Sequence, residues 1–361
     1  MREPEPFDAI VIGSGFAGSV TACRLAEAGL RVCILERGRR FDSRQDFPVY
    51  PRPNDPNVPS DAPEDGRDIV QPDVSRMFWK LGKGVWDFRD LGDTLVGQAA
   101  GYGGGSLIYA NVHLRPPPDT FDERWRMVEY GDDEQPYQQR GKLDPYFDLA
   151  AIMLDVAPLP TKYADIPKRV QLKRAARDLN GFQKGRPGVD ESIDEPYLRT
   201  VSTPLAVNFQ EGHQGSDGKP RGVCDLKGNC CLGCKQGAKN TLDLNYLKRA
   251  EDLRETPAEV RTLAEVTWIE RNEAEDQRFT VEYRDHREGG ATKRVRADYV
   301  FLCAGAVNTT ELLMRCHAAR KLTLTGHGLG TRFHPNQDSL SAVFDCDEPQ
   351  ELDRGPTITS T

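Results

Sequence analysis

The pattern of apolar and polar positions predicts a strand, a helix and a second strand at the start of the chain. A short apolar run, residues 9–12, stands in the segment FDAIVIG. The next segment, SVTACRLAEAG, has apolar residues along one face at helical spacing and ends at Gly29, a residue that suits a left-handed helix end. A second apolar run, residues 31–35, leads into Glu36. This order is typical of a βαβ unit.

Further along, apolar patterns of period two predict an antiparallel β-meander. Its strands are expected at residues 262–271, at residues 279–284 and in a segment that leads through Val295. A separate buried strand is expected at residues 297–303, followed by a glycine and a helix capped near Asn308 or Thr309. Residues 121–222 differ in character, with helices expected at 142–154 and 168–180, and are interpreted as part of an inserted second domain.

Composition and charge exclude several classes of protein. The chain has 361 residues and a net charge of −8, which argues against a nucleic-acid partner because such a partner needs a basic face. No segment approaches 18 uninterrupted apolar residues, so no transmembrane segment is expected. The start, MREPEPFDAIVIG, lacks the features of a secretory signal, and the cytoplasm is the expected location.

The turn after the first strand carries the strongest chemical signal. It reads Gly13-Ser14-Gly15-Phe16-Ala17-Gly18, which is G-x-G-x-x-G between a strand and a helix. The first glycine permits the tight turn, the second lets the backbone approach a pyrophosphate, and the third lets the helix pack on the strand. Glu36 stands where a carboxylate can accept hydrogen bonds from ribose hydroxyls. The segment therefore predicts a dinucleotide site, although a glycine-rich turn of another βαβ unit is the alternative.

A second glycine-rich stretch lies at residues 97–106 and reads GQAAGYGGGS. Glycines at this density suggest backbone that lies flat against a ligand, with a flexible linker as the alternative. The glycines run directly into the apolar segment Leu107-Ile108-Tyr109, which favours ligand contact. Near residue 305, the strand–glycine–helix arrangement can bring backbone to the same ligand.

Seven of the nine cysteines fall into two groups. Cys23, Cys33 and Cys303 lie in apolar strand or helix patterns and are expected to be buried. A cluster with the spacing C-x5-C-C-x2-C consists of Cys224, Cys230, Cys231 and Cys234. The cluster allows a metal or iron–sulfur site or a structural turn, and the spacing, which fits neither a paired C-x2-C zinc site nor a ferredoxin run, favours the turn and no metal.

Three segments together resemble the glucose–methanol–choline (GMC) family of FAD-dependent oxidoreductases, and within it the cholesterol-oxidase-like branch. They are IVIGSGFAGSVTACRLAEAGLRVCILERG, GYGGGSLIYANV and YVFLCAGAVNTTELLMR. The stretch GCKQGAKNTLDLNYL is similar to the same branch. The resemblance implies an α/β fold with a Rossmann-like, glutathione-reductase-type FAD-binding domain that carries the meander, together with an inserted, incomplete α+β substrate domain. Residues 1–118 and 223–338 would form the FAD-binding domain, and residues 119–222 and 339–361 the substrate domain.

The resemblance also implies which residues contact FAD. Those of the first βαβ unit are Gly13, Ser14, Gly15, Phe16, Ala17, Gly18, Glu36 and Arg37. Those expected near the isoalloxazine and its ribityl chain are Gly104, Gly105, Ser106, Tyr109 and Asn111. Tyr109 stands where relatives often have an asparagine. The remaining contacts are Val266, through its backbone to adenine, Ala304, Gly305, Asn336 and Asp338.

By the same resemblance, an alcohol, expected to be sterol-like, gives a hydride to flavin N5 while a base takes its hydroxyl proton, and oxygen or another acceptor takes up the electrons. None of the six histidines stands in the context of the family's catalytic His and Asn pair, which is expected beyond Thr361. His334 is interpreted as a loop histidine. Two alternatives remain: a flavin-binding fragment that lacks catalysis, and an NAD-dependent Rossmann dehydrogenase.

Overall fold

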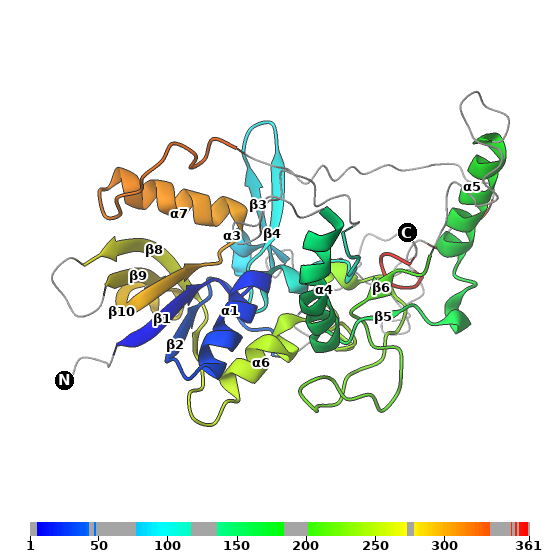
Figure 1. Ribbon diagram of the computed structural model, residues 1–361, viewed down its shortest axis with the longest axis horizontal. Helices are drawn as coiled ribbons and strands as arrows, with labels where there is room; N and C mark the ends of the chain where they lie inside the picture. The colour runs from blue at the N-terminus through cyan, green and yellow to red at the C-terminus, as the bar shows by residue number, and fades with distance from the viewer. Residues whose placement is uncertain are drawn as a thin grey trace, which may run out of the picture. The chain divides into compact units, whose positions relative to one another are not determined.

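The computed structural model describes residues 6–42, 47, 77–116, 136–183, 201–272, 278–332, 348, 351 and 354–359 (Figure 1). The chain divides into two compact units. The first unit contains residues 1–109, 231–235 and 241–342, and the second contains residues 110–230, 236–240 and 343–361. The substrate-domain role expected for the inserted region stays a prediction. In the described part of the chain, no helix is both long and apolar enough to cross a bilayer.

The first unit is built on a six-stranded mixed sheet with the order β7-β2-β1-β10-β9-β8. The strands are β1 (Phe7–Ile12), β2 (Val32–Leu35), β7 (Glu259–Arg261), β8 (Ala264–Arg271), β9 (Phe279–Asp285) and β10 (Ala291–Leu302). Strands β7, β2, β1 and β10 run parallel, whereas β10, β9 and β8 pair antiparallel. The mixed α/β class and the meander expected from the sequence are therefore confirmed.

Strand β10 corrects one expectation about this sheet. The sequence predicts two strands, one through Val295 and another at residues 297–303, but the structure has one continuous strand of 12 residues. Its first half pairs antiparallel with β9 and its second half pairs parallel with β1, and Ala297 has partners on both sides. Ala297 is fully buried, so no turn can interrupt the strand at this point.

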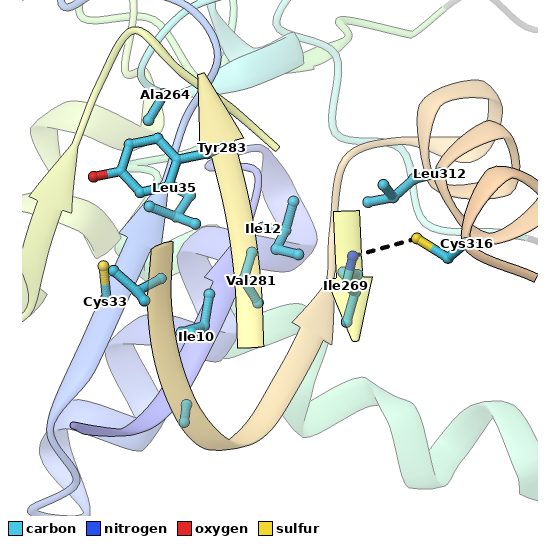
Figure 2. Packing of buried hydrophobic residues seen from close by; sticks show 12 residues of the cluster. Ile10, Ile12, Cys33, Leu35, Ala264, Ile269, Val281, Tyr283, Leu312 and Cys316 are labelled. Atoms are coloured by element: carbon cyan, nitrogen blue, oxygen red, sulfur yellow. Dashed lines mark hydrogen bonds between the residues drawn. The ribbon is translucent and has the colours of Figure 1, made fainter. Parts of the chain in front are cut away.

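Helices cover both faces of the sheet (Figure 1). Figure 2 shows Ile10 and Ile12 of β1 in one apolar cluster with Leu312 and Cys316 of α7 (Ala306–Ala318). The backbone N–H of Ile269 donates to the Cys316 sulfur at 3.3 Å. Because side chains alternate along a strand, the intervening buried residues of β1 face the opposite side, which α1 (Phe16–Glu27) covers.

Helix α1 ends as the sequence predicts. Gly29 adopts φ +84°, and its N–H donates to the Ala26 carbonyl, while the Leu30 N–H donates to the Leu25 carbonyl. This pair of hydrogen bonds is a Schellman motif, which needs a residue in the left-handed region. Helix α7, by contrast, begins at Ala306 with Gly305 as its N-cap, so the expected caps Asn308 and Thr309 lie inside the helix.

Smaller elements complete the first unit. They are α3 (Trp79–Gly82), β3 (Trp86–Asp90), β4 (Leu95–Ala99), η2 (Gly104–Leu107), η6 (Cys230–Leu232, shared with the second unit), η7 (Leu242–Leu244), α6 (Tyr246–Glu251) and η8 (His286–Glu288). Strands β3 and β4 form an antiparallel hairpin with Trp86 opposite Ala99. The second unit contains α4 (Pro136–Met153), β5 (Ala157–Pro158), η5 (Thr161–Tyr163), α5 (Pro167–Gln183) and β6 (Pro204–Leu205), so both helices predicted there exist and are longer than expected.

We expect Gly18→Ala to destabilise the protein strongly. A Cβ at residue 18 would lie 1.9 Å from the Gly13 carbonyl oxygen, so α1 would have to move away from the turn that precedes it. The cost of such overpacking is about 1–3 kcal/mol or more. Gly141→Ala is the matched control, because residue 141 is exposed within α4 with open space around it and alanine favours a helix by about 1 kcal/mol. Urea denaturation measures both, and equal midpoints would contradict this account.

Candidate functional site

A cavity of about 810 Å³ lies at the carboxyl ends of the parallel strands in the first unit. Strands β1, β2 and β10 end there, with Ile12, Leu35 and Leu302 in its lining. In open α/β sheets, ligands bind in the crevice at this edge. Each neighbouring element also contributes to the lining, and the glycine, polar and charged residues are Gly13, Ser14, Gly15, Glu36, Arg37, Arg89, Gly97, Gln98, Gly104, Gly105, Glu265, Cys303, Gly305, Asn308, Thr309, Thr310, Glu311 and Arg315.

The first glycine turn has the geometry that its sequence predicts. Gly13 adopts φ +95°, and a Cβ there would lie 2.4 Å from the Cys303 carbonyl oxygen. Gly15 differs, because its Cβ would meet nothing closer than 3.9 Å, and the residue lines the cavity. Gly13 and Gly18 therefore serve the packing of the protein on itself, while Gly15 leaves backbone open toward a ligand.

The glycines of the second run also differ in whether they pack against backbone or have open space around them. Gly104 has φ +52°, and a Cβ on it would lie 2.5 Å from the Gly15 Cα, so the two glycine segments touch backbone to backbone. Gly101 approaches Gly38, whose Cβ would lie 2.1 Å from the Gly101 nitrogen. Gly105 has open space around it and lines the cavity. Part of this run therefore holds the site together, and part of it is exposed to the cavity.

Two helices begin at the cavity. The N-cap residues are Gly15 for α1 and Gly305 for α7, and both line the cavity. Neither has a side-chain cap among the described residues, and neither helix has an acidic residue in its first turn. Free backbone N–H groups and the positive end of a helix dipole attract phosphate groups. The cavity therefore offers two places for the phosphates of a dinucleotide.

The carboxylate of Glu36 joins three segments around the cavity. Its Oε2 accepts from the Ser14 N–H at 3.0 Å and from the Ser14 hydroxyl at 2.6 Å, and its Oε1 accepts from the Gly38 N–H at 2.7 Å. The Ser14 hydroxyl in turn accepts from the Gly103 N–H at 3.0 Å. A carboxylate oxygen has two acceptor sites, so Oε1 can take a further donor such as a ribose hydroxyl.

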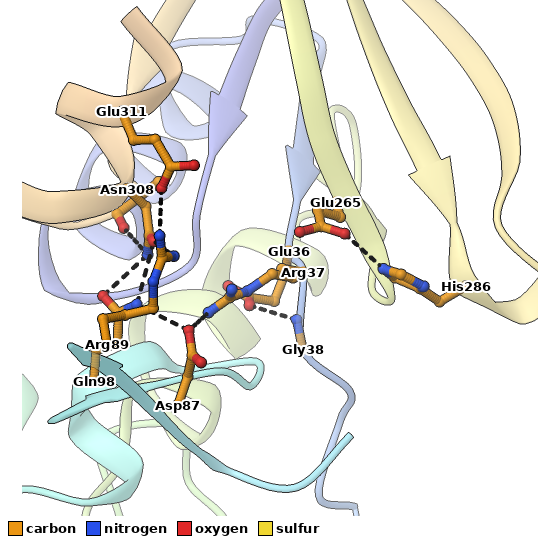
Figure 3. Close-up of polar contacts among 11 residues, drawn as sticks. Glu36, Arg37, Gly38, Asp87, Arg89, Gln98, Glu265, His286, Asn308 and Glu311 are labelled. Atoms are coloured by element: carbon orange, nitrogen blue, oxygen red, sulfur yellow. Dashed lines mark hydrogen bonds and ion pairs between the residues drawn. The ribbon is translucent and has the colours of Figure 1, made fainter. Parts of the chain in front are cut away.

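The β3–β4 hairpin is linked to both sides of the cavity (Figure 3). Asp87 of β3 accepts from Arg37 at 2.8 Å and from Gln98 of β4 at 2.9 Å. Gln98 and Asn308 of α7 exchange two amide hydrogen bonds of 3.2 and 3.1 Å. Arg89 extends this network, with contacts to Asn308 and to Glu311. Side chains from the segment after β2, the hairpin and α7 thus form one polar network along the wall of the cavity.

The start of β8 is supported from outside the cavity. Glu265 and Val266 both line it. The Glu265 carboxylate lies 3.0 Å from the ring nitrogen Nε2 of His286. The backbone N–H of His286 donates to the Leu263 carbonyl at 2.8 Å. The His286 ring also packs edge-on against Trp79, with ring centroids 5.6 Å apart. This histidine, the first residue of η8, therefore orders the segment in which the adenine contact is expected.

Comparison with known proteins identifies the family. A family model described as GMC oxidoreductase matches residues 7–335. The chain belongs to the GMC oxidoreductase family. This is a flavoprotein family with an FAD-binding domain. Its resemblance to GMC enzymes, first seen in three sequence segments, is thereby confirmed.

Individual relatives agree with this assignment. The chain is similar to cholesterol oxidases of Mycobacterium tuberculosis, with 31% identity over 98% of this chain and 56% of the relative, and of Acinetobacter baumannii, with 27% identity over 98% and 58%. It is also 26% identical to the gluconate 2-dehydrogenase flavoprotein of Pantoea cypripedii, over 95% of this chain and 58% of that protein. A structure of Aspergillus oryzae formate oxidase aligns with a TM-score of 0.48 at 17% identity, covering 87% of this chain and 48% of that one. The chain spans about half the length of the curated relatives it matches.

The described residues fit the cofactor of the GMC family. Gly15 and Gly105 leave room where side chains would enter the cavity, and two helix N-termini face it. Glu36 lies at the end of β2, where a dinucleotide-binding domain places the acid that contacts ribose. Phe16, Ala17, Arg37, Val266 and Ala304 complete the expected residues that line the cavity.

Other residues expected to contact the GMC cofactor have structural partners. The Ser106 hydroxyl donates to the Gly103 carbonyl at 2.7 Å and accepts from the Leu242 N–H at 3.1 Å, and Ser106 does not line the cavity. Gly18 also lies outside the lining, and Tyr109 packs edge-on against Phe16 at 5.4 Å.

Asn111 belongs to the second unit, where it is fully buried with φ +67°. Neither atom of its side-chain amide has a hydrogen-bond partner among the described residues, a costly state that a bound ligand can relieve. Its contact with FAD stays a prediction. Asn336 and Asp338, like His334, lie outside the described residues.

Several residues that line the cavity are not among those predicted from the sequence. Arg89, Gln98 and Asn308 belong to the polar network, and Glu265 faces the cavity beside Val266. The segment WDFRD with the turn that follows it carried a hairpin signal. The pairing of Gln98 with Asn308 had no local signal, because 210 residues separate them along the chain.

The cysteines only partly follow expectation. Cys23 and Cys33 are buried, and burial raises the pKa of Cys23 to about 11 and that of Cys33 to about 12. Cys303 was expected to be buried, but it is only partly so and lines the cavity, because it stands at the end of β10, where the sheet opens. No group of three potential metal ligands occurs in the part of the chain that the structure describes.

Glu36→Gln is expected to destabilise the protein before any cofactor binds. The amide can accept on one side only, so its NH₂ group would face a buried donor of Ser14 or Gly38. An unsatisfied buried donor costs about 1–3 kcal/mol. Glu311→Gln is the control, because this half-exposed carboxylate pairs among the described residues with the partly exposed Arg89 and Arg315, and its loss should cost less than about 1 kcal/mol. Urea denaturation without FAD compares the two, and a smaller loss for Glu36→Gln than for the control would refute the role of Glu36.

Cys303 provides a chemical probe of the cavity. We expect an alkylating reagent to modify it slowly, with a rate that keeps rising above pH 9, because burial raises the pKa of this thiol. A dinucleotide in the cavity should slow the reaction further at every pH. Mass spectrometry of the labelled peptide measures the rate, with Cys234 as an unprotected internal control. Equal rates at Cys303 with and without FAD would show that FAD does not cover it.

Proposed function

We propose that this chain binds FAD in the cavity at the carboxyl ends of β1, β2 and β10 and forms the cofactor-holding part of an oxidoreductase that acts on the CH–OH group of an alcohol. The observation that carries the proposal is the glycine-lined cavity into which two helix N-termini open. Membership of the GMC family supports the choice of FAD over other dinucleotides.

Each element of the first unit has its own part in holding the cofactor. The N–H groups of the turn at Gly15 and Phe16 bind the pyrophosphate, and the start of α7 adds its dipole. Glu36 accepts from the adenosine ribose, and the backbone of Val266 contacts adenine. Gly104 and Gly105 lie beside the flavin half. The family resemblance alone supports Asn111, Asn336 and Asp338 as further contacts to the flavin.

The chemistry itself belongs to the cofactor. The chemistry that FAD would supply when bound is uptake of a hydride from the carbinol carbon of the alcohol and transfer of the electrons to oxygen or to another acceptor. The chain's own residues orient the cofactor and exclude water from its phosphates. Among the described residues no histidine lines the cavity, so we assign this part of the chain to binding and orientation.

A sterol or a similar bulky apolar alcohol is the substrate that we propose. Its support is the similarity to two cholesterol oxidases, at 31% and 27% identity. The chain is also similar to a gluconate 2-dehydrogenase flavoprotein, at 26% identity. Polar alcohols are therefore the substrates against which the sterol proposal has to be compared. Because the chain spans about half of each relative, substrate and activity are both proposals.

FAD titration is the first test. We expect the purified chain to take up FAD, with quenched flavin fluorescence and a raised melting temperature, and to gain nothing from NAD. A ligand present at 100 times its dissociation constant stabilises a protein by about 2.7 kcal/mol. Protection by NAD and not by FAD would establish the nicotinamide alternative instead and overturn the proposal.

Anaerobic mixing with alcohols is the second test. Bleaching of the bound flavin by cholesterol, and not by gluconate, is the expected result if the chain carries the activity and prefers sterols. FAD uptake without bleaching by any alcohol would leave cofactor binding standing and show a chain that lacks catalysis by itself. Bleaching by gluconate alone would refute the sterol assignment.

A further inference from the structure

A buried ion pair in the wall of the cavity is not explained by the contacts assigned above. Arg37 lines the cavity directly after Glu36, and its Nη2 donates to Asp87 Oδ2 at 2.8 Å. The Asp87 side chain is only 1% exposed, whereas that of Arg37 is 18% exposed. One partner thus reaches the cavity and the other lies behind it, within the β3–β4 hairpin (Figure 3).

We propose that Asp87 is a positioning residue for the cofactor: it holds the Arg37 guanidinium at the cavity wall so that Arg37 contacts the adenosine half of FAD. The proposal rests on the FAD binding proposed above. It assigns to the hairpin a function in cofactor recognition that operates through a single arginine.

Arg37 is held on two sides. The ion pair with Asp87 fixes one edge of the guanidinium, and its Cζ lies 5.0 Å from the centre of the Trp79 ring. Trp79 is itself buried and is held by the edge of His286. A guanidinium that is paired and held against an aromatic ring in advance loses less side-chain entropy when it binds a ligand. These contacts make Arg37 a pre-ordered surface of the site.

Asp87 also controls a second residue of the cavity lining. Its Oδ2 accepts from Gln98 Nε2 at 2.9 Å, and Gln98 is paired in turn with Asn308 of α7. Asp87 Oδ1 has no hydrogen-bond partner in the described part of the chain, so Arg37 is the cation there that balances its charge. A buried carboxylate needs such a partner, and this requirement makes the position of Arg37 specific.

The position of Arg37 along the chain points to the adenosine half. It follows Glu36 at the end of β2, where the ribose of a dinucleotide is bound. Glu265 and Val266, at the start of β8, line the same cavity. Glu265 is linked to Trp79 through His286, and Arg37 contacts Trp79 directly. The contact is therefore expected to be with adenosine and not with the flavin ring.

The first experiment compares Asp87→Asn with Asp90→Asn. The control makes the same chemical change on the same strand, at an exposed residue whose described contact is a turn hydrogen bond that it accepts from the Gly92 N–H. We expect FAD to dissociate about tenfold faster from Asp87→Asn and at the wild-type rate from the control, because a neutral amide replaces the charge-assisted pairing with Arg37 by a weaker neutral acceptor and so holds the guanidinium less firmly. The dissociation constant of ADP should rise by the same factor. Equal FAD rates in both variants, or an effect on FAD without one on ADP, would overturn the proposal.

The second experiment needs no cofactor. The Nε–Hε signal of Arg37, assigned by substitution in arginine-labelled protein, should report an ordered side chain in the wild type and in Asp90→Asn, and a mobile one in Asp87→Asn. An equally ordered Arg37 in Asp87→Asn would refute positioning. A wild-type protein that binds no FAD would instead contradict the proposed function, and the NMR comparison would still decide whether Asp87 orders Arg37.

A double variant covers the case in which Asp87→Asn does not fold. Arg37→Met with Asp87→Leu replaces a buried ion pair by apolar side chains of similar volume, a change that proteins often tolerate. We expect this variant to melt as the wild type does without FAD and to release FAD at least tenfold faster. Release at the wild-type rate would show that Arg37 makes no contact and would overturn the proposal.

Discussion

The buried carboxylate of Glu36 is the interaction on which the site depends. It accepts hydrogen bonds from the Ser14 N–H and hydroxyl and from the Gly38 N–H. The Ser14 hydroxyl in turn accepts a hydrogen bond from the Gly103 N–H. One charge thus joins the first turn, the end of β2 and the second glycine run. A carboxylate taken out of water must be satisfied in this way, because its desolvation is otherwise too costly. The same requirement brings the three cavity-lining segments together.

Close backbone contacts then determine the form of the cavity. Gly104 lies against Gly15, Gly38 lies against Gly101, and Gly13 lies against the carbonyl of Cys303, in each case at a distance that a Cβ would prevent. Because these contacts are between backbones, the glycine positions add no side chains to the wall of the cavity. A flat, extended ligand with phosphate groups fits such a surface, which agrees with membership of a flavoprotein family.

Strand β10 and the β3–β4 hairpin connect this glycine framework to the rest of the first unit. Ala297 is paired on both sides, so a single strand carries the antiparallel meander and also completes the parallel sheet at whose edge the cavity opens. The hairpin contributes another part of the wall, where Asp87 is buried and pairs with Arg37 and Gln98. The cavity wall is therefore a network of paired polar groups, and its geometry depends on contacts between segments that are distant in the chain.

The sequence by itself determined the βαβ unit, the meander, the left-handed end of α1 at Gly29 and the family, because these depend on local spacing and on residues with special backbone conformations. It did not determine that β10 is continuous, that α7 begins at Ala306, or that Cys303 opens to the cavity, since each follows from pairing or packing with distant strands. Local patterns also identified glycines as ligand contacts without separating the two uses that the fold makes of them. Only the tertiary structure showed that a Cβ at Gly13, Gly18 or Gly104 would collide with protein backbone, whereas a Cβ at Gly15 or Gly105 would not, because a missing Cβ has no meaning until its neighbour in space is known.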